Sequence, residues 1–386
     1  MKRVLLVVAL SLAVPPGASA SDWTLAHARA VLRSQIVTGT DASQPDRPVF
    51  SVTLDPTQAA RLRKAGRRFS YAGPAHDLLG LGTIDVSFTV EPVGPSDFDV
   101  TSFQGPPADG AQPALPLRAA FFYGWFSEAW SQQGYLPFTR YRPAGGFYDS
   151  TDTQVIAHEI DAMRYGKIAA GIYSWWGRDS NTDERFPLYL QAARQTPFRW
   201  AVYDEDEGYR DPSVDEIRRD LEYIRDEYAS KPSYLRIGGR FVVFAYGGAE
   251  SCDVADRWTQ ANTVGAYIVL PAFAGFRDCP HQPDSWHFYS ASIPEFELHG
   301  YAYGICPGFW RIDEQPRLER DLERWKQDVR DMIASGEPLQ LVLTFNEWGE
   351  GTSVEAADSW ASPSGYGAYL DALHSDGGPR NFFSPS

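Results

Sequence analysis

The chain has 386 residues, of which 50 are acidic and 35 are basic, so its formal net charge at pH 7 is −15. This length accommodates one large domain and a smaller one. The acidity argues against nucleic acid and anionic membranes as partners, because both attract basic surfaces. A neutral polysaccharide suits the charge better, and the aromatic content of 14% offers flat rings on which sugars pack.

The first 20 residues have the pattern of a secretory signal peptide. Lys2 and Arg3 precede an apolar stretch over 4–14, and Ala18-Ser19-Ala20 provides the small-x-small pattern of a cleavage site. The apolar stretch is too short to span a bilayer, and no other stretch approaches 18 apolar residues. We therefore expect a secreted protein, extracellular or periplasmic, without a membrane-spanning segment.

Residues 21–115 are predicted to form a small β-rich N-terminal module followed by a linker. Alternating apolar and polar residues predict strands over 50–54 and 83–90, with a basic helical stretch over 58–68 between them. Residues 92–116 are rich in Pro, Gly, Asp and Gln, as is typical of a linker. The module is either a spacer or a carbohydrate- or wall-binding domain, and no row of exposed aromatics argues for binding.

Residues 116–378 alternate apolar runs with amphipathic helical stretches, and residues 379–386 form a tail. The helical stretches lie at 153–165, 184–195, 213–229, 249–263 and 316–335. The apolar runs, which predict buried strands, lie at 117–125, 168–176, 198–204, 240–246, 265–273, 285–292, 300–306 and 339–346. Because buried runs that alternate with helices are typical of parallel strands, eight such units predict an α/β fold, a (β/α)8 TIM barrel.

Local signals mark two of these helices. Asp152 is the expected N-cap of the first, and Pro212 is expected at the start of the third, where its missing N–H has no cost. His158 and Glu159 lie on the first helix without the second His of an HExxH zinc motif, so we expect both at the surface.

Three cysteines in an exported chain permit one disulfide and leave one thiol over. Cys252 and Cys279 follow successive predicted strands, which favours a bond between them and leaves Cys306 unpaired. None of the three has the spacing of a zinc ligand set, so we expect no metal.

In a barrel of this kind the chemistry lies at the carboxyl ends of the strands. Aromatic, acidic and amide side chains gather at the predicted ends, and we expect them to bind substrate. They are Tyr123, Trp125, Trp175, Trp176, Tyr203, Glu205, Tyr246, His287, Trp310, Asn346 and Trp348. Rings of Tyr and Trp suit a sugar site because one face packs on C–H groups while the polar tip forms hydrogen bonds. For any single aromatic residue, packing in the core remains the alternative.

The most informative segment is the run 341–352, which reads Leu-Val-Leu-Thr-Phe-Asn-Glu-Trp-Gly-Glu-Gly-Thr. A buried strand here delivers two carboxyl groups, Glu347 and Glu350, to one place, and Gly349 between them permits a sharp turn. Cleavage of a glycosidic bond needs two such groups to move protons. We therefore expect Glu347 and Glu350 to be catalytic.

Four segments, in order, resemble glycoside hydrolase family 99, the endo-α-1,2-mannosidase and endo-α-1,2-mannanase family. They are Phe122–Trp125, Tyr141–Pro143 with Gly146–Asp152, Ser174–Gly177, and Phe345–Thr352. The resemblance covers about residues 117–360 and leaves the N-terminal module outside. It implies a secreted barrel that cleaves internal α-mannosidic bonds with retention, without a metal or other cofactor. Carried over to this chain, Glu347 is the general base on the sugar's own 2-hydroxyl and Glu350 is the general acid.

The third strand departs from the family pattern, which commonly reads His-Ile-Glu-Pro-Tyr where this chain has Val-Tyr-Asp-Glu-Asp over 202–206. The substrate-contacting acid is therefore Glu205 or Asp204, and the identity of the sugar is open. A non-catalytic carbohydrate-binding or adhesion protein is one alternative function. Glycosyltransfer is another, because a related NEWxEG element occurs among glycosyltransferases, but an exported protein rarely meets an activated sugar donor. We expect a monomer whose partner is a polysaccharide or glycan.

Overall fold

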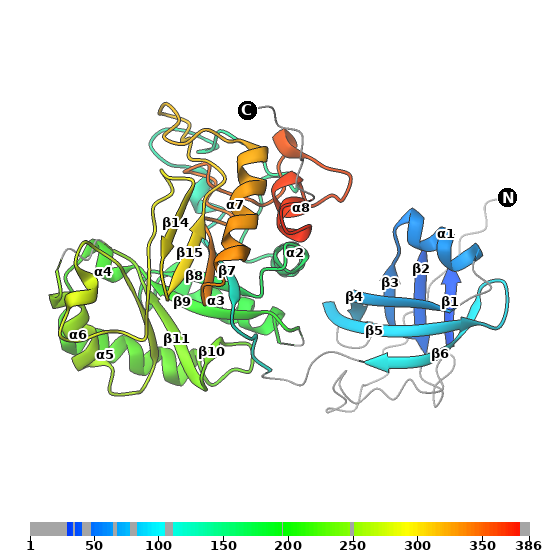
Figure 1. Cartoon of the computed structure of the whole chain (residues 1–386), viewed down its shortest axis with the longest axis horizontal. Coiled ribbons are helices and arrows are strands. Elements are labelled where there is room, and N and C mark those ends of the chain that lie inside the picture. The colour runs from blue at the N-terminus through cyan, green and yellow to red at the C-terminus, as the bar shows by residue number, and fades with distance from the viewer. Residues whose placement is uncertain are drawn as a thin grey trace. The chain divides into compact units, whose positions relative to one another are not determined.

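The computed structural model describes residues 29–33, 35–40, 48–64, 68–77, 83–104, 111–194, 196–247 and 251–378. The predicted signal peptide and tail lie outside these ranges. The chain divides into two compact units, Met1–Pro106 and Pro107–Ser386 (Figure 1). Each unit contains a hydrophobic core made only of its own residues. Among the described residues, no helix is long and apolar enough to cross a membrane.

The first unit is a closed antiparallel barrel with one helix. Its elements are β1 (Arg29–Arg33), β2 (Ile36–Thr40), β3 (Pro48–Thr53), α1 (Pro56–Lys64), β4 (Phe69–Asp77), β5 (Thr83–Pro92) and β6 (Asp97–Gln104). Neighbours in sequence pair with one another, and β6 closes the barrel by pairing with β1. Alternate residues such as Val86, Phe88 and Val90 on β5 face its core, as the period of two requires.

The prediction of a linker over 92–116 is wrong for Asp97–Gln104. Strand β6 spans these residues, and Phe98 and Val100 alternate with polar residues and are buried in the core. Further along, the Gln112 side chain donates to the carbonyl oxygen of Tyr234 (3.0 Å) and accepts from the amide of Arg236 (2.8 Å). These bonds attach Gln112 to the second unit, which therefore begins before the boundary at residue 116 expected from composition.

Among its described residues, the second unit contains eight strands that run parallel to their paired neighbours, and each lies within a predicted apolar run. They are β7 (Leu117–Phe122), β8 (Ala170–Trp175), β9 (Arg199–Asp204), β11 (Arg240–Ala245), β12 (Tyr267–Pro271), β13 (Ser285–His287), β15 (Ala302–Ile305) and β16 (Leu339–Val342). Two further strands pair antiparallel at the side of this set: β10 (Arg236–Ile237) with β11, and β14 (Glu295–Leu298) with β15. β16 pairs with β7, which joins the last strand to the first.

The ring of strands is nearly closed rather than closed. The order of hydrogen-bonded neighbours runs from β13 through β7 and β16 to β15 and β14, and within the described residues no pairing joins β13 to β15. The reason is local: β13 has only three residues, and β14 occupies the edge of β15 that β13 would otherwise use. The barrel is therefore interrupted between its sixth and seventh parallel strands.

Helices connect most of the strands, as Figure 1 shows. The α-helices are α2 (Thr153–Tyr165), α3 (Asn181–Ala192), α4 (Asp206–Tyr209), α5 (Val214–Tyr223), α6 (Asp253–Ala261), α7 (Leu322–Ser335) and α8 (Ala368–His374). Short helical turns are η2 (Glu128–Trp130), η3 (Ile224–Tyr228, a π-helix that continues α5), η4 (Phe276–Asp278) and η5 (Asp358–Trp360).

The structure confirms one predicted helix start and corrects another. Asp152 caps α2 and accepts a hydrogen bond from the amide of Gln154 (2.8 Å). Pro212 is not the first residue of α5, because Ser213 is the N-cap and forms a capping box with Glu216. Two reciprocal hydrogen bonds thus define the start of α5, and Pro212 lies just outside it.

Alternation along each strand decides which side chains face the inside of the barrel. On β7, Leu117, Ala119 and Phe121 belong to the interior cluster, whereas Ala120 and Phe122 pack in the layer beneath the helices. Both faces of such a strand are covered, and this explains why the strands appear in the sequence as unbroken apolar runs.

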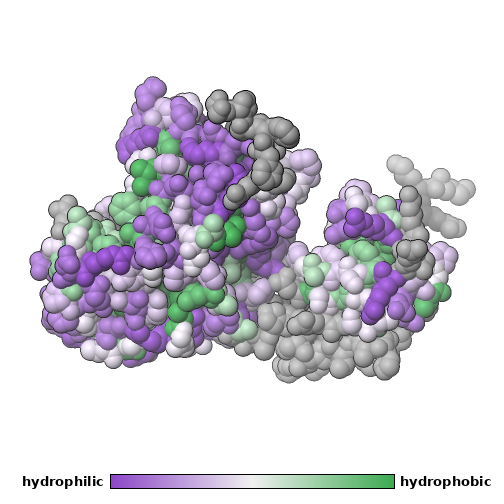
Figure 2. Space-filling view, in the orientation of Figure 1, coloured by the Kyte–Doolittle hydropathy of each residue, from purple (hydrophilic) through white to green (hydrophobic). Residues whose placement is uncertain are grey.

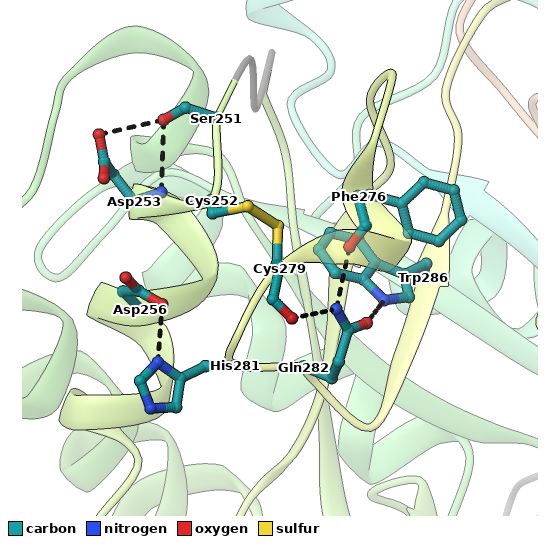
Figure 3. The surroundings of a disulfide bond; sticks show 9 residues. All are labelled: Ser251, Cys252, Asp253, Asp256, Phe276, Cys279, His281, Gln282 and Trp286. Carbon is teal, nitrogen blue, oxygen red and sulfur yellow. Dashed lines mark hydrogen bonds and ion pairs between the residues drawn. A yellow bond between two sulfur atoms is a disulfide. The ribbon is translucent and has the colours of Figure 1, made fainter.

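The predicted disulfide joins Cys252 and Cys279, which follow β11 and β12 (Figure 3). The hydrogen bond between His281 and Asp256 (2.8 Å) crosses the same pair of segments. Cys306 is the unpaired cysteine, as predicted, and is buried, where its Sγ donates to the carbonyl oxygen of Ala291 (3.2 Å). Burial raises the pKa of this thiol to about 12.

Candidate active site

A tight turn after β16 holds Glu347 and Glu350 close together. The amide of Glu347 donates to Thr344 Oγ1 (2.9 Å), and the amide of Glu350 donates to Glu347 Oε1 (3.3 Å). A hydrogen bond attaches the turn to the segment between β15 and α7: the amide of Trp310 donates to the carbonyl oxygen of Glu350 (2.9 Å). The next residue of the turn, Gly351, has a φ of +66°, and an added Cβ would lie 2.5 Å from the Trp310 carbonyl oxygen. The turn therefore requires glycine at this position.

The two carboxyl groups are linked electrostatically. Burial raises the pKa of Glu347 well above its ordinary value, and the charge of Glu350 raises it further. Burial also raises the pKa of Glu350, although the positive charges of Arg311 and Arg317 lower it. Because two carboxyl groups in one buried site cannot both ionise easily, their coupling favours a state in which the pair keeps one proton.

Hydrogen bonding favours one location for this proton. Glu347 accepts a hydrogen bond from the amide of Glu350, which stabilises an ionised Glu347. The Oε2 atom of Glu350 is buried and has no hydrogen-bond partner among the described residues, which favours a neutral Glu350. The deeper burial of Glu347 and the arginines near Glu350 act in the opposite sense, so a small change in surroundings can move the proton between them.

Glu205 adds a third buried carboxyl group. It follows β9 and accepts a hydrogen bond from Ser174 Oγ (2.6 Å), which in turn accepts one from Trp176 Nε1 (3.1 Å). Burial raises the pKa of Glu205 to about 8, the bond from Ser174 lowers it, and the charge of Glu350 raises it. Asp204 is also buried, but its pKa responds to the charge of Asp220 and not to the catalytic candidates. Of the two acids that the sequence left open, Glu205 faces the Glu347–Glu350 pair.

Tyrosines from four segments form the wall beside these acids. The hydroxyl oxygens of Tyr123 and Tyr289 lie 2.9 Å apart. The ring of Tyr203 lies 5.7 Å from that of Tyr246. Burial raises the pKa of Tyr289 well above its ordinary value, and the charges of Glu350 and Glu347 add to the shift. A cavity of about 380 Å³ lies at this wall, lined by Tyr203, Tyr246, Gly247, Pro271, Ala272, Phe273, His287, Phe288 and Tyr289.

His287 lies at the base of this cavity as a neutral ring. Its Nε2 donates to the carbonyl oxygen of Ala245 (2.8 Å), which leaves Nδ1 as a buried acceptor with no partner among the described residues. Burial lowers the pKa of His287 to about 4, and the bond to Ala245 raises it. His287 is therefore a neutral ring at neutral pH, with an acceptor nitrogen that no described residue uses.

Three predicted substrate-binding residues do not face the cavity. Trp175 is fully buried and donates to Asp183 Oδ1 (2.7 Å), because alternation on β8 turns it toward the helices. Trp348 is also fully buried and packs against the ring of Trp360, 6.1 Å away. Asn346 uses its amide on the backbone of Tyr123, whose N–H it accepts (2.8 Å) and to whose carbonyl it donates (2.9 Å). The contacts of these three residues are with other parts of the protein, so they stabilise the surroundings of the site and do not line the cavity.

The remaining predicted aromatics form the rim. Trp125 is half-buried with its ring 4.6 Å from Tyr123, and Trp176 is 37% exposed with its ring 6.3 Å from Trp125. A second cavity, of about 290 Å³, begins at Trp176 and is lined by Gly177, Arg178, Asp206, Arg210, Glu216, Arg219 and Asp220. Trp310 lies on the other side of the acids, half-buried, with the guanidinium of Arg140 4.1 Å from its ring centre.

Several residues of the site were not predicted as such from the sequence. Ser174 and Tyr289 continue the inward-facing rows of their strands, so the period of two identifies them once the strand register is known. The ring of Tyr209 on α4 lies 4.7 Å from that of Trp176. Tyr209 follows a run of acidic residues, so the sequence pattern gave no reason to place it in the site. Glu159, expected at the surface, is fully buried, and this part of the prediction is wrong.

Comparison with known proteins supports the resemblance seen in the sequence. No family model matches the chain. It is 22% identical over 270 residues to a protein of Mus musculus named glycoprotein endo-alpha-1,2-mannosidase; the match covers 56% of each chain, so this chain spans about half the length of that relative.

Its fold resembles that of the GH99 endo-alpha-mannosidase from Bacteroides thetaiotaomicron, with a TM-score of 0.53 and 19% identity over 69% of this chain and 96% of the other. A structure titled glycoside hydrolase-like protein gives a TM-score of 0.51 at 15% identity over 70% of this chain and 96% of the other. The resemblance to glycoside hydrolase family 99 is therefore confirmed, and the second unit has a GH99-like fold.

Proposed function

We propose that the barrel is a glycoside hydrolase that cleaves internal α-mannosidic bonds with retention of configuration. The observation that carries the proposal is the buried, electrostatically coupled Glu347–Glu350 pair beside Glu205 and a tyrosine-lined cavity. General acid–base chemistry needs one carboxyl protonated and one ionised at the same pH, which such a pair provides. The names of the mouse and Bacteroides proteins give the bond class.

In the first step Glu347 removes the proton from the 2-hydroxyl of the bound sugar, and that oxygen attacks C1. Glu350 donates its proton to the glycosidic oxygen as the C1–O bond breaks. The products are a 1,2-anhydro sugar, a free leaving alcohol, a protonated Glu347 and an ionised Glu350. This attack requires O2 and the leaving oxygen on opposite faces of the ring, as they are in α-mannosides but not in α-glucosides.

In the second step Glu350 takes a proton from water, whose oxygen attacks C1 and opens the three-membered ring. The O2 atom recovers its proton from Glu347. Both carboxyl groups return to their starting states, and two displacements at C1 give net retention. Glu205, whose pKa burial raises to about 8, donates a hydrogen bond to the sugar in its neutral form.

We propose further that the protein is exported. The N-terminal segment has the pattern of a signal peptide, and disulfides such as Cys252–Cys279 form and persist in oxidising compartments.

The proposal is tested by incubating the protein with α-1,2-linked mannan oligosaccharides and with matched α-glucans, and by following products with mass spectrometry. We expect internal cleavage of the mannan alone. Glu350→Gln should lower the rate by 10²–10⁴-fold, the usual contribution of a general acid. The same variant should retain most of its activity on a glycosyl fluoride, whose leaving group needs no proton, whereas Glu347→Gln should fail on both substrates.

Glu323→Gln on α7 is the charge-matched control, because Glu323 lies at the surface and pairs with Lys326. Its rates should equal those of the unsubstituted protein. Full activity of both the Glu347 and Glu350 variants would exclude these roles. Binding of mannan without new reducing ends would favour a carbohydrate-binding protein instead.

A further inference from the structure

A second pair of buried carboxyl groups lies behind the turn that holds Glu347. Glu159 comes from α2 and is fully buried, and neither of its carboxyl oxygens has a hydrogen-bond partner among the described residues. Glu355 follows the turn and is 8% exposed. Its Oε2 atom accepts from the Tyr148 hydroxyl (2.8 Å) and from Trp348 Nε1 (3.0 Å).

This pair is connected to the residues on either side of Glu347. Trp348 Nε1 also lies 3.1 Å from the Tyr148 hydroxyl oxygen, to which Asn346 Nδ2 donates at 3.4 Å. Asn346 and Trp348 are the immediate neighbours of Glu347 in the chain. The backbone of Glu347 is thus held between two side chains that belong to one buried hydrogen-bond network.

The surroundings assign different charge states to the two acids. The ionisable groups that face Glu159 are Glu355, Tyr148 and, from β8 and α3, Tyr173 and Tyr189. Within the described residues neither acid forms an ion pair with a basic side chain. Glu355 accepts two hydrogen bonds, which favour its ionised form. Tyr148 and Asn346 lie near Glu159 and favour its charged form, but neither completes a hydrogen bond to its carboxyl oxygens, so burial favours the neutral form of Glu159.

Burial raises the pKa of Glu159 well above its ordinary value and the charge of Glu355 raises it further, while the polar groups of Tyr148 and Asn346 lower it. Burial raises the pKa of Glu355 to about 7, while the bonds from Tyr148 and Trp348 lower it. These directions agree with the geometry, which favours the proton on Glu159 and the negative charge on Glu355.

We propose that Glu159 and Glu355 share a single proton, and that Glu355 is a positioning residue whose remaining charge orients Tyr148 and Trp348 and thereby the backbone of Glu347. Charge-assisted hydrogen bonds are about twice as strong as neutral ones, so the ionised acid holds the turn more firmly than an amide. A second negative charge at Glu159 would repel the first in a buried site. The effect on the reaction rests on the proposed function, whereas the shared proton does not.

Thermal unfolding across the pH range tests the shared proton without any glycan. Glu159 has a higher pKa in the folded chain than in the unfolded chain, so the folded state binds more protons and stability falls as pH rises above about 4.3. Glu159→Gln removes this loss. The Tm of the variant should therefore rise relative to the unsubstituted protein, by on the order of 5 °C between pH 5 and pH 8.

Glu227→Gln is the matched control, because Glu227 is an exposed acid on η3 and its Tm difference should stay constant with pH. In mannan hydrolysis, Glu159→Gln should keep kcat within about twofold, since it retains a neutral partner. Glu355→Gln should lower kcat by about tenfold or more with KM unchanged, because it loses the charge that orients the turn.

A Tm difference for Glu159→Gln that does not change with pH would overturn the shared proton. Wild-type kcat in a folded Glu355→Gln variant would overturn the positioning role. If Glu355→Gln does not fold, the pH profile of Glu159→Gln still decides the first point. Absence of hydrolysis by the unsubstituted protein would contradict the proposed function alone.

Discussion

Two adjacent tryptophans at the end of β8 have opposite surroundings because successive side chains on a strand point to opposite faces. Trp175 has no exposed surface and its indole donates to Asp183, whereas Trp176 is 37% exposed at the rim beside Trp125 and Tyr209. Both residues have the same side chain, so the difference in their exposure comes from their positions in the chain alone. One is a core residue, and the other offers a ring face to a ligand.

Replacing each tryptophan by alanine should therefore have distinct effects. Trp175→Ala should destabilise the barrel by about 3–5 kcal/mol, the usual cost of removing a buried indole. Trp176→Ala should leave Tm within a few degrees but raise KM for mannan oligosaccharides by roughly tenfold, since it removes a stacking surface. Calorimetry and initial-rate kinetics on the two variants measure both effects. Equal loss of stability in both variants would show that Trp176 is a core residue as well.

At the same scale, Glu159 is a residue whose burial the sequence did not lead us to predict. A charged residue on a helix is usually solvated, so the residue type alone predicts the surface. On α2, however, Ile156, Ile160 and Met163 mark the buried face, and Glu159 lies three residues after the first of them. Its position on that face was readable from helical spacing, whereas its partner Glu355 lies in a loop with no periodicity to reveal it.

At the scale of elements, Asn346 ties the end of β16 to the end of β7. Its side-chain amide forms both hydrogen bonds that the backbone of Tyr123 can offer, and all three groups are buried. Asn262 makes the same two-bond clamp on the backbone of Ala266, where α6 leads into β12. The chain therefore supplies a matched comparison for the same amide geometry at two different places.

Asn346→Ala leaves a buried N–H and a buried carbonyl unpaired, each at a cost of about 1–3 kcal/mol. We expect a lower Tm and a kcat reduced by at least tenfold, with little change in KM, because Tyr123 and Glu347 lose their register. Asn262→Ala should lower Tm by a similar mechanism and leave kcat unchanged. An unchanged kcat in both variants would mean that the clamp at Asn346 serves stability alone.

The elements themselves were largely predictable, because eight buried runs between helices specify parallel strands through packing alone. Two features of the fold were not predicted in this way. β6 was hidden by the Pro, Gly and Asp residues around it, although Phe98 and Val100 alternate as a strand requires. The β14–β15 hairpin competes with β13 for the same backbone edge, and such competition between strands for hydrogen bonds leaves no mark in hydrophobic periodicity.

At the scale of the whole molecule, the two units have separate cores. Phe88 belongs to the core of the first unit, and Met332 belongs to the large core of the second. On the face shown in Figure 2, hydrophilic residues cover most of the second unit, and hydrophobic residues occur in small separate groups. Each unit thus buries a hydrophobic core of its own.

Separate cores predict separate responses to core mutations. Phe88→Ala should lower the unfolding temperature of the first unit, at a cost of about 3–5 kcal/mol, and leave the rate of mannan hydrolysis unchanged. Met332→Ala should instead destabilise the barrel by about 2–5 kcal/mol. Differential scanning calorimetry together with activity measured below the first transition checks both expectations. Loss of hydrolysis in the folded Phe88→Ala variant would assign the first unit a part in the reaction.

The interruption between β13 and β15 has a consequence for how this fold tolerates change. Seven of the eight contacts between parallel neighbours are backbone ladders, and inserting a residue into any of them shifts a register that many side chains depend on. The eighth position has no ladder between β13 and β15, so extra length in the loop between β13 and β14 disturbs no strand. Insertions and deletions among relatives of this barrel should therefore accumulate between residues 290 and 294, next to the tyrosine-lined cavity. New substrate preferences would then arise in this loop while the rest of the ring stays constant.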